Sequence, residues 1–282
     1  MNSTKTETYK DLIDIKGILH LKVPIFYRLI PRFILRYFQK ILHEKDINGA
    51  LFRNRNLSGI DFVDAILLEF GANITVTGLE NIEPDKRFIV VSNHPLGGLD
   101  GLALMSVIGR VRRDIVFPVN DFLLNLPNLK ELFVPLNKVG KNNSGNSELL
   151  NSTFASNKML LYFPAGLVSR NQKGTIKDLE WKKTFVNKAI QYQRDVIPVH
   201  IDGKNSNFFY RLANLRKIAG IRFNIEMLYL VDEMYKQKNK NIRITIGKPI
   251  PFSTFSKEHK PIEWANKIKK IVYSLPEKSN NI

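Results

Sequence analysis

Short, continuously apolar runs alternate along this chain with longer segments whose apolar residues recur at helical spacing. Each short run is followed by polar residues or proline, which is typical of buried strands. These runs cover residues 88–91, 115–119, 159–163 and 196–201, and two further strands are predicted at 73–78 and 242–247. Helices are predicted at 102–108, 180–191, 207–219, 224–235 and 261–274. The alternation indicates an α/β fold with a mixed, mostly parallel sheet flanked by helices.

The segments between these elements are less regular. Residues 46–70 predict a turn and then a helix, with Ser58 as its N-cap. Residues 121–136 predict a short helical stretch rich in leucine and phenylalanine. Residues 140–148, rich in asparagine, serine and glycine, predict a mobile surface loop.

A stripe of cations distinguishes the amino-terminal part. Four of them recur every fourth residue among large apolar and aromatic side chains: Arg28, Arg32, Arg36 and Lys40. Like charges at this spacing repel one another on a helix, and lipid phosphates along the stripe would relieve the repulsion. The pattern predicts an amphipathic helix at a membrane surface, with Phe33 in the acyl boundary. A helix packed on its own domain with a solvated basic face is the alternative, and the prolines at 24 and 31 also allow two short helices.

These patterns divide the chain into three parts. We expect a helical membrane-surface segment at 1–70, an α/β domain at 71–275 and a polar tail at 276–282. The cationic segment carries a charge in every turn, so it does not predict a membrane span. Residues 1–14 are polar and contain acids, unlike a secretory signal, so we expect a peripheral protein on the cytoplasmic face of the inner membrane.

Charge and composition narrow the chemistry. With 43 Lys plus Arg against 26 Asp plus Glu, the net charge of +17 predicts an anionic partner, which is nucleic acid, a lipid surface or a phosphorylated substrate. The absence of cysteine excludes disulfides, thiolate catalysis and cysteine-ligated zinc. No Gly-x-Ser-x-Gly elbow, P-loop or cluster of metal-ligating residues is present, so we expect no metal and no bound cofactor.

One histidine follows a predicted buried strand. His94 comes directly after the run at 88–91 and Ser92-Asn93, and Asp100 lies six residues further on. Ligands of open α/β sheets bind at the carboxyl ends of strands. An imidazole held there by a carboxylate can act as a general base. His94 and Asp100 are therefore the candidate catalytic pair.

Three blocks of sequence together resemble a known family. They are Asn93-His94-Pro95 with Asp100, the run Phe163-Pro164-Ala165-Gly166-Leu167-Val168-Ser169-Arg170, and Val196-Ile197-Pro198-Val199. In order and approximate spacing they resemble the motifs of the glycerolipid acyltransferases, the lysophosphatidate acyltransferase superfamily. Within it, the chain resembles the hemolysin-like bacterial branch that includes O-acyltransferases of glycine and ornithine lipids.

The resemblance implies the site and the reaction. It implies that His94 and Asp100 catalyse transfer of a fatty acyl group from acyl carrier protein or coenzyme A to a hydroxyl of a lysolipid, without an acyl-enzyme. The implied substrate-binding residues are Asn93, Lys138, Phe163, Pro164, Gly166, Ser169 and Arg170, with Arg170 and Lys138 on a phosphate. The turn at 164–167 is the candidate site for the oxyanion.

This chain departs from the family pattern at several positions. Five residues instead of four separate His94 from Asp100, and we expect the glycines at 97 and 98 to absorb the extra one. Ala165 and Val168 replace a glutamate and an arginine that the family associates with the acceptor's head group, and Lys138 stands near the place of another arginine. These changes favour a lyso-aminolipid over 1-acylglycerol-3-phosphate as the acceptor.

Two other functions stay open at this stage. A peripheral membrane protein that binds lipid without turnover would share the cationic stripe. A nucleic-acid-binding protein would explain the net charge, but apolar side chains line the stripe and no nucleic-acid motif accompanies it, so we expect no nucleic acid partner. The expected partners are the lysolipid, the acyl thioester and an anionic membrane surface.

Overall fold

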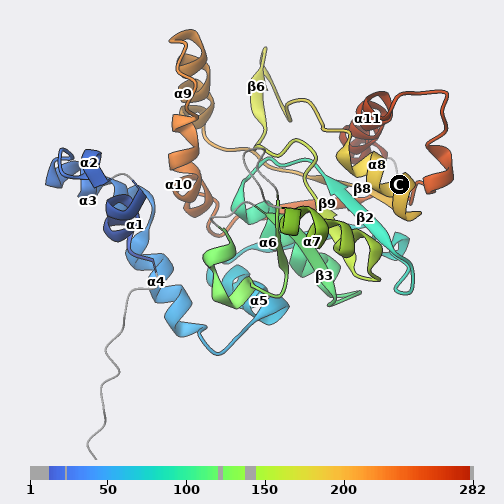
Figure 1. Cartoon of the computed structure of the whole chain (residues 1–282), viewed down its shortest axis with the longest axis horizontal. Coiled ribbons are helices and arrows are strands. Elements are labelled where there is room, and N and C mark those ends of the chain that lie inside the picture. Colours follow the sequence, from blue (N-terminus) through green and yellow to red (C-terminus); the bar gives the residue numbers. More distant parts are fainter. Residues whose placement is uncertain (1–12, 23, 120–122, 137–143, 280–282) are drawn as a thin grey trace, which may run out of the picture.

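A seven-stranded sheet with β2 (Phe88–Ser92) at its centre forms the core of the computed structural model, which describes residues 13–22, 24–119, 123–136 and 144–279 (Figure 1). The strand order is β1-β9-β8-β2-β5-β3-β4. The other strands are β1 (Asn73–Thr77), β3 (Ile115–Val119), β4 (Phe133–Pro135), β5 (Met159–Tyr162), β8 (Asp195–Ile201) and β9 (Asn241–Ile246). Among the described strands of this sheet, β8 and β9 pair antiparallel and all other neighbours pair parallel, which confirms the mixed, mostly parallel sheet.

Both faces of the sheet are buried, which explains the continuously apolar strands. On β2, Phe88 and Val90 pack in one cluster, while Ile89 and Val91 pack in another. The first cluster includes side chains of α5 (Gly59–Glu69) and α6 (Gly98–Gly109). The second includes side chains of α7 (Ser144–Ala155), α8 (Thr184–Tyr192) and α11 (Pro261–Ser279). Helices therefore flank the sheet on both faces, as predicted.

The amino-terminal helices extend to one side of this body (Figure 1). They are α1 (Ile15–Lys22), α2 (Pro24–Tyr27), α3 (Arg32–Ile41) and α4 (Glu44–Arg53). The single cationic helix is replaced by two, because Pro31 lacks an N–H group and α3 begins directly after it. Arg28 consequently lies in the turn between α2 and α3, and only three of the four cations share a helix.

Helices lie close to both predicted boundaries of the sheet domain, whose positions stay predictions. Residues 46–53 belong to α4 and residues 59–69 form α5, and both helices contribute buried side chains to the main core, including Leu51 of α4. Ser58 occupies the N-cap position of α5 but makes no side-chain cap. At the other end, α11 continues through Pro276 to Ser279, which places most of the predicted tail in a helix.

Several connecting segments also differ from the predictions. Residues 123–136 form two short 3₁₀ helices (Leu123–Asn125 and Pro127–Leu129) and the edge strand β4, whose three residues and proline give a weak strand signal. Residues 144–148 begin α7 and are not a loop. The hairpin of β6 (Arg170–Gln172) and β7 (Thr175–Lys177) was not predicted. Residues 225–235 form a 3₁₀ helix (Ile225–Tyr229) and α10 (Leu230–Tyr235) in place of one helix.

Candidate active site

The candidate catalytic histidine lies where β2 ends, on a segment fixed to the neighbouring strand. Asn93 accepts a hydrogen bond from the Ile201 N–H at 2.7 Å and donates from Nδ2 to the Ile201 carbonyl at 2.8 Å. This two-point contact joins the ends of β2 and β8, which pair in parallel. The Asn93 side chain is buried and positions the segment, and its predicted contact with substrate stays a prediction.

His94 and Asp100 meet despite the extra residue between them. The His94 Nδ1 atom lies 2.7 Å from Asp100 Oδ2. Gly97 adopts a φ of 80°, which a residue with a side chain rarely takes, and α6 begins at Gly98. Asp100 therefore lies in the first turn of α6 and faces back towards His94. Gly97 alone supplies the positive φ, whereas Gly98 is helical, which corrects the expectation for the second glycine.

Hydrogen bonds fix the chemistry of the pair. The Leu96 and Gly97 N–H groups donate to the Asp100 carboxylate at 2.9 and 3.1 Å. Complete burial raises the pKa of Asp100, and the hydrogen bond from His94 opposes that rise. Because an ionised carboxylate only accepts hydrogen bonds, the imidazole proton resides on Nδ1 when Asp100 is ionised. Nε2 then carries the lone pair, and it has no hydrogen-bond partner among the described residues.

The imidazole is supported by aromatic rings of the adjacent strands. Phe163 follows β5, and its ring stacks on that of His94 with centroids 4.1 Å apart and an angle of 18° between the planes. The Phe117 ring of β3 meets the edge of Phe163 at 5.1 Å. The His94 side chain is 17% exposed, so solvent or a substrate can reach it. The structure thus brings Phe163 against the candidate catalytic histidine, and its predicted role in substrate binding stays a prediction.

A buried carboxylate that sequence reasoning missed supports the same loop. Asp178 Oδ1 accepts hydrogen bonds from the His94 N–H at 3.1 Å and the Ser169 hydroxyl at 2.5 Å. Its Oδ2 accepts from Trp181 Nε1 at 2.8 Å. The Ser169 N–H also donates to the His94 carbonyl at 2.7 Å. Asp178 therefore fixes the His94 backbone to the segment after β5.

Two residues with a predicted role in substrate binding, Ser169 and Arg170, make contacts inside the protein. The Ser169 hydroxyl is buried on Asp178. Arg170 is also buried, and its Nη2 donates to Glu226 Oε1 at 2.8 Å while its Nη1 donates to the Val168 carbonyl. Burial lowers the pKa of Arg170, and Glu226 opposes that effect. Both side chains thus hold segments of the site together, and their predicted contacts with substrate stay predictions.

The turn after β5 has backbone donors close to the histidine. Pro164 begins the turn, and Gly166, with a φ of 65°, donates its N–H to the Phe163 carbonyl at 3.0 Å. Within the described residues, the N–H groups of Ala165 and Leu167 have no acceptor. Ala165 and Val168, where the family carries charged side chains, are buried and packed among apolar neighbours.

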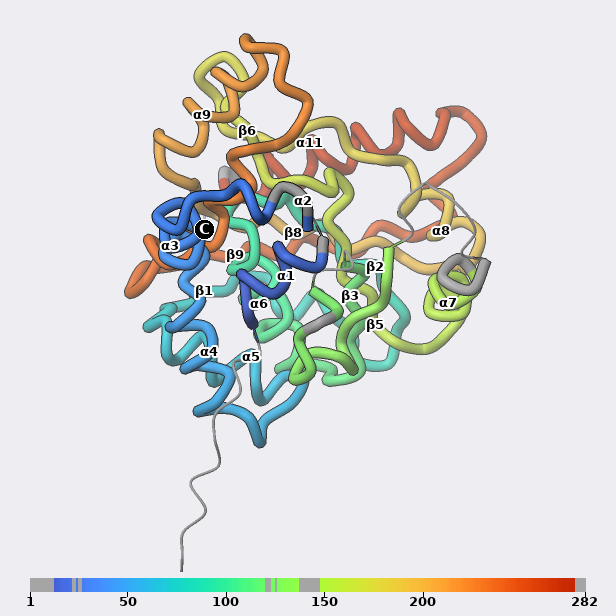
Figure 2. The backbone as a smooth tube through the Cα atoms, turned by 60° about the vertical axis from the view of Figure 1, so that its left-hand side comes forward, coloured from blue at the N-terminus to red at the C-terminus, as the bar shows by residue number. Residues whose placement is uncertain are grey.

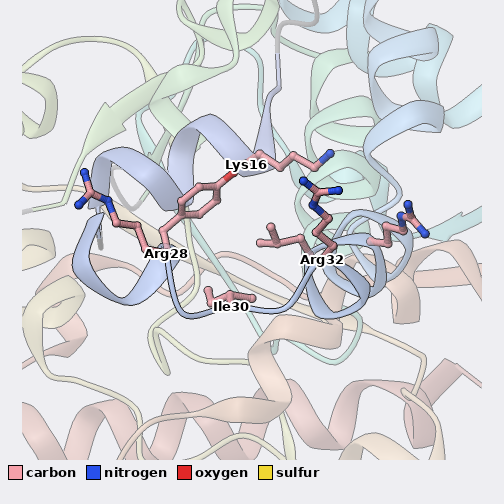
Figure 3. A pocket seen from close by; sticks show the side chains of 7 residues that line it. Lys16, Arg28, Ile30 and Arg32 are labelled. Carbon is pink, nitrogen blue, oxygen red and sulfur yellow. The ribbon is translucent and has the colours of Figure 1, made fainter.

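The predicted cations lie outside this loop. Lys138 falls outside the described residues. Arg28, Arg32 and Arg36, together with Lys16, line an open hollow of about 520 Å³ between α1 and α3 (Figure 3). Lys40 is exposed on the last turn of α3. The cations thus surround a depression of the amino-terminal helices, and they do not form the single straight stripe that was expected.

The described residues offer neither a metal site nor a membrane-spanning helix. In the ranges that the structure describes, no three His, Cys, Asp or Glu side chains are arranged to hold a metal ion. Within the same ranges, no helix has both the length and the apolar character to span a bilayer.

Known proteins resemble this chain over most of its length. The chain is 48% identical over 265 residues to the lyso-glycine lipid O-acyltransferase of Bacteroides thetaiotaomicron, covering 94% of this chain and 97% of the relative. It is 46% identical to the protein of the same name from Phocaeicola vulgatus, covering 94% and 95%. The 1-acyl-sn-glycerophosphate acyltransferase of Thermotoga maritima aligns over 94% of this chain and 98% of its own, with 18% identity and a TM-score of 0.48. Residues 17–280 match the family model described as acyltransferase, and the chain therefore belongs to the acyltransferase family.

Proposed function

We propose that this enzyme transfers a fatty acyl group from a thioester of acyl carrier protein or coenzyme A to a hydroxyl of a lyso-glycine lipid. One observation carries the mechanism, which is the 2.7 Å contact of His94 Nδ1 with the buried Asp100 at the carboxyl end of β2. The contact directs the unprotonated Nε2 away from Asp100, and the partial exposure of the ring makes it accessible to an acceptor.

The reaction is a direct transfer. As the acceptor oxygen bonds to the thioester carbonyl carbon, His94 Nε2 removes the hydroxyl proton. Asp100 stabilises the imidazolium that forms. The tetrahedral intermediate then collapses with cleavage of the carbon–sulfur bond, and the imidazolium returns its proton to the thiolate. No enzyme side chain becomes acylated.

The turn after β5 is suited to stabilise the intermediate. The carbonyl oxygen becomes anionic in the tetrahedral state, and backbone N–H groups without a protein acceptor can bind it. The N–H groups of Ala165 and Leu167 meet this requirement within the described structure, and the Phe163 ring beside them contacts the imidazole.

The names of the relatives and the altered motif both favour the lyso-glycine lipid. Val168, where the family carries an arginine, is buried against Phe209 and Tyr210 of α9 (Asn207–Ile218). Ala165 is also buried and cannot carry a charge to the acceptor. Both curated relatives are named for lyso-glycine lipid. We therefore place 1-acylglycerol-3-phosphate second among acceptors.

The amino-terminal helices suggest where the enzyme works. Phe33 and Leu29 are 70% and 74% exposed beside the cations of α3 and the α2–α3 turn. Such a combination of apolar and cationic side chains suits an anionic lipid surface. We propose peripheral association with the cytoplasmic face of the inner membrane, where a lysolipid can leave the bilayer for the site.

The test is acyl transfer by purified protein. Lyso-glycine lipid is incubated with acyl carrier protein or coenzyme A thioesters, and the product is measured by mass spectrometry. We expect His94→Ala to lose at least about 10²–10⁴-fold in rate while retaining its circular dichroism and vesicle binding. His259→Ala, which removes an exposed histidine near α11, is the matched control and should retain activity. Undiminished transfer by His94→Ala would overturn the mechanism.

A further inference from the structure

The outer end of α9 exposes apolar side chains that no neighbouring element of the described structure covers. Leu215, Ile218 and Phe223 are 62%, 84% and 65% exposed, and Ile221 between them is also exposed. The opposite face of the helix is buried, because Phe209 and Tyr210 pack beside Val168 close to the catalytic loop. The apolar surface of α9 therefore continues beyond what the core buries, which is typical of a contact surface.

The same region carries positive charge without any acid. Between residues 203 and 225 the chain contains four arginines or lysines beyond Lys204 and no aspartate or glutamate, namely Arg211, Arg216, Lys217 and Arg222. Arg216 pairs with the buried Glu226. Arg211, Lys217 and Arg222 are exposed and form no ion pair with the described residues. The surface thus offers three solvated cations beside four exposed apolar side chains.

This surface lies on the same flank as the amino-terminal helices. Figures 1 and 2 place α9 and α3 towards the same side of the molecule, with α9 above α3. The Tyr37 hydroxyl of α3 lies 2.9 Å from the Tyr229 hydroxyl, which belongs to the 3₁₀ helix that follows α9. Tyr229 meets the Phe208 ring at the base of α9, so this contact joins α3 to the base of the helix whose outer end is exposed.

We propose that the end of α9 is a second membrane-contacting element, which inserts into the interface of an anionic bilayer together with α3. We call it the α9 tip and define it as Leu215, Lys217, Ile218, Ile221, Arg222 and Phe223. Its apolar side chains enter the acyl boundary, and its cations bind lipid phosphates or carboxylates. The lack of acids favours an anionic lipid surface over a protein partner.

The position of the tip gives it a mechanistic consequence. The base of α9 packs against Val168, and Leu230 of α10 lies close to Gly97 in the catalytic loop. A tip that is inserted in lipid would therefore hold the active site at a fixed height above the bilayer. This inference rests on the proposed function for its purpose, but membrane insertion itself requires no acyl transfer.

Vesicle binding of the full chain tests the proposal. The tip variant combines Leu215→Ser, Ile218→Ser and Phe223→Ser, and the control combines Leu68→Ser, Leu149→Ser and Ile190→Ser, which are exposed apolar residues of α5, α7 and α8. With vesicles of phosphatidylcholine and phosphatidylglycerol, we expect the partition coefficient of the tip variant to fall roughly tenfold or more and that of the control to stay within about twofold. Equal losses in both variants would overturn the proposal.

Direct insertion is measured with Phe223→Trp in the full chain. We expect the added fluorescence of this variant over its parent to shift to the blue on anionic vesicles and to be quenched by brominated lipids. An unshifted and unquenched signal would overturn the proposal, as would a dimer in solution that the tip variant dissociates, because the surface would then join two copies of this chain.

Catalysis provides an independent readout. With a monodisperse short-chain acceptor in the absence of vesicles, the tip variant should keep the activity of its parent. Insertion without any acyl transfer would overturn the proposed function and leave the α9 tip assignment intact. If the tip variant binds vesicles as its parent does and acylates vesicle-bound acceptor at the parent's rate, only the α9 tip assignment would be overturned.

Discussion

In the His94 loop the supporting polar side chains are buried and paired, whereas α3 and the α9 tip hold cations and apolar side chains in solvent. Asp100 and Asp178 are both fully buried and accept several hydrogen bonds each. By contrast, Arg32 and Arg36 are exposed around an open hollow, and Phe33 projects from the same helix. The two regions belong to one enzyme but depend on different physical effects.

The difference concerns how each region tolerates change. Proton transfer needs an imidazole placed to within a few tenths of an ångström, so the loss of one hydrogen bond can affect the whole site. Adhesion to a membrane sums many modest contributions from charge and apolar area, none of which requires a fixed geometry. We therefore expect single substitutions to act strongly in the loop and weakly on the surface.

Asp100→Asn should have the largest effect. The amide would present a donor to the Leu96 and Gly97 N–H groups or to His94 Nδ1, so the imidazole would lose its orientation and its tautomer. We expect kcat to fall about 10³–10⁴-fold, as is typical when the acid of a His–Asp pair is replaced by an amide. Steady-state kinetics on folded protein measures this, and a loss below tenfold would contradict the role of the pair.

Asp178→Asn should have the second largest effect on catalysis, because Asp178 holds His94 in position. Asp178 accepts hydrogen bonds from three donors, and in the variant one of these donors would face an amide NH₂ group. We expect the free energy of unfolding to fall by about 3 kcal/mol. We also expect a roughly tenfold lower kcat with little change in KM.

Asp195→Asn is the matched control for this prediction, because Asp195 accepts from the Phe252 N–H at the opposite end of the sheet domain. It should lower the melting temperature without lowering kcat. An Asp178→Asn protein with a full kcat at a temperature where it is folded would show that Asp178 is only structural.

Removing the cations of the amino-terminal helices should affect binding and spare catalysis. With Arg28, Arg32, Arg36 and Lys40 all changed to Gln, binding to anionic vesicles at low salt should weaken roughly 1,000-fold, since each of the four cations near such a surface contributes about 1 kcal/mol. A control with Lys248, Lys257, Lys260 and Lys270 changed to Gln has the same net charge. Equal binding of the two variants would show that α3 does not face the membrane.

The smallest expected effect is on the pH dependence of the melting temperature, and it comes from the buried Asp100 carboxyl. In a His94→Gln background no imidazole opposes the raised pKa of Asp100. A folded-state pKa above the unfolded value of about 3.9 stabilises the fold at low pH, and this contribution is lost as the pH rises through the folded pKa. Relative to His94→Gln with Asp100→Asn, the melting temperature should therefore fall as the pH rises above the unfolded pKa. A difference in melting temperature between the two variants that stays constant with pH would contradict this prediction.

The same contrast explains what the sequence could predict. His94 and Asp100 could be found because a strand end and a short spacing are local signals. The cations of α3 could be found because charge and periodicity are visible without a fold. Asp178 could not be found, because its bond to the His94 N–H spans 84 positions and no local pattern marks it. The internal roles of Asn93 and Arg170 were missed for the same reason, since their partners are distant in the chain.

The edges of the fold were the least predictable part. The sheet and the helices on its faces followed from apolar periodicity, which reports burial directly. β4 and the β6–β7 hairpin have three residues per strand, too few for periodicity to register. The α9 tip was hidden for the opposite reason, because its apolar residues continue a regular helical pattern and only the fold shows that nothing covers them.

The backbone clamp on His94 also has a kinetic meaning. Because Asp178 and Ser169 hold the histidine's own N–H and C=O groups, folding fixes the backbone that carries the proposed base. In the proposed mechanism, acceptors with different tails would therefore meet the same proton acceptor. Selectivity among them would then arise at the entrance to the site and at the membrane, upstream of the chemical step.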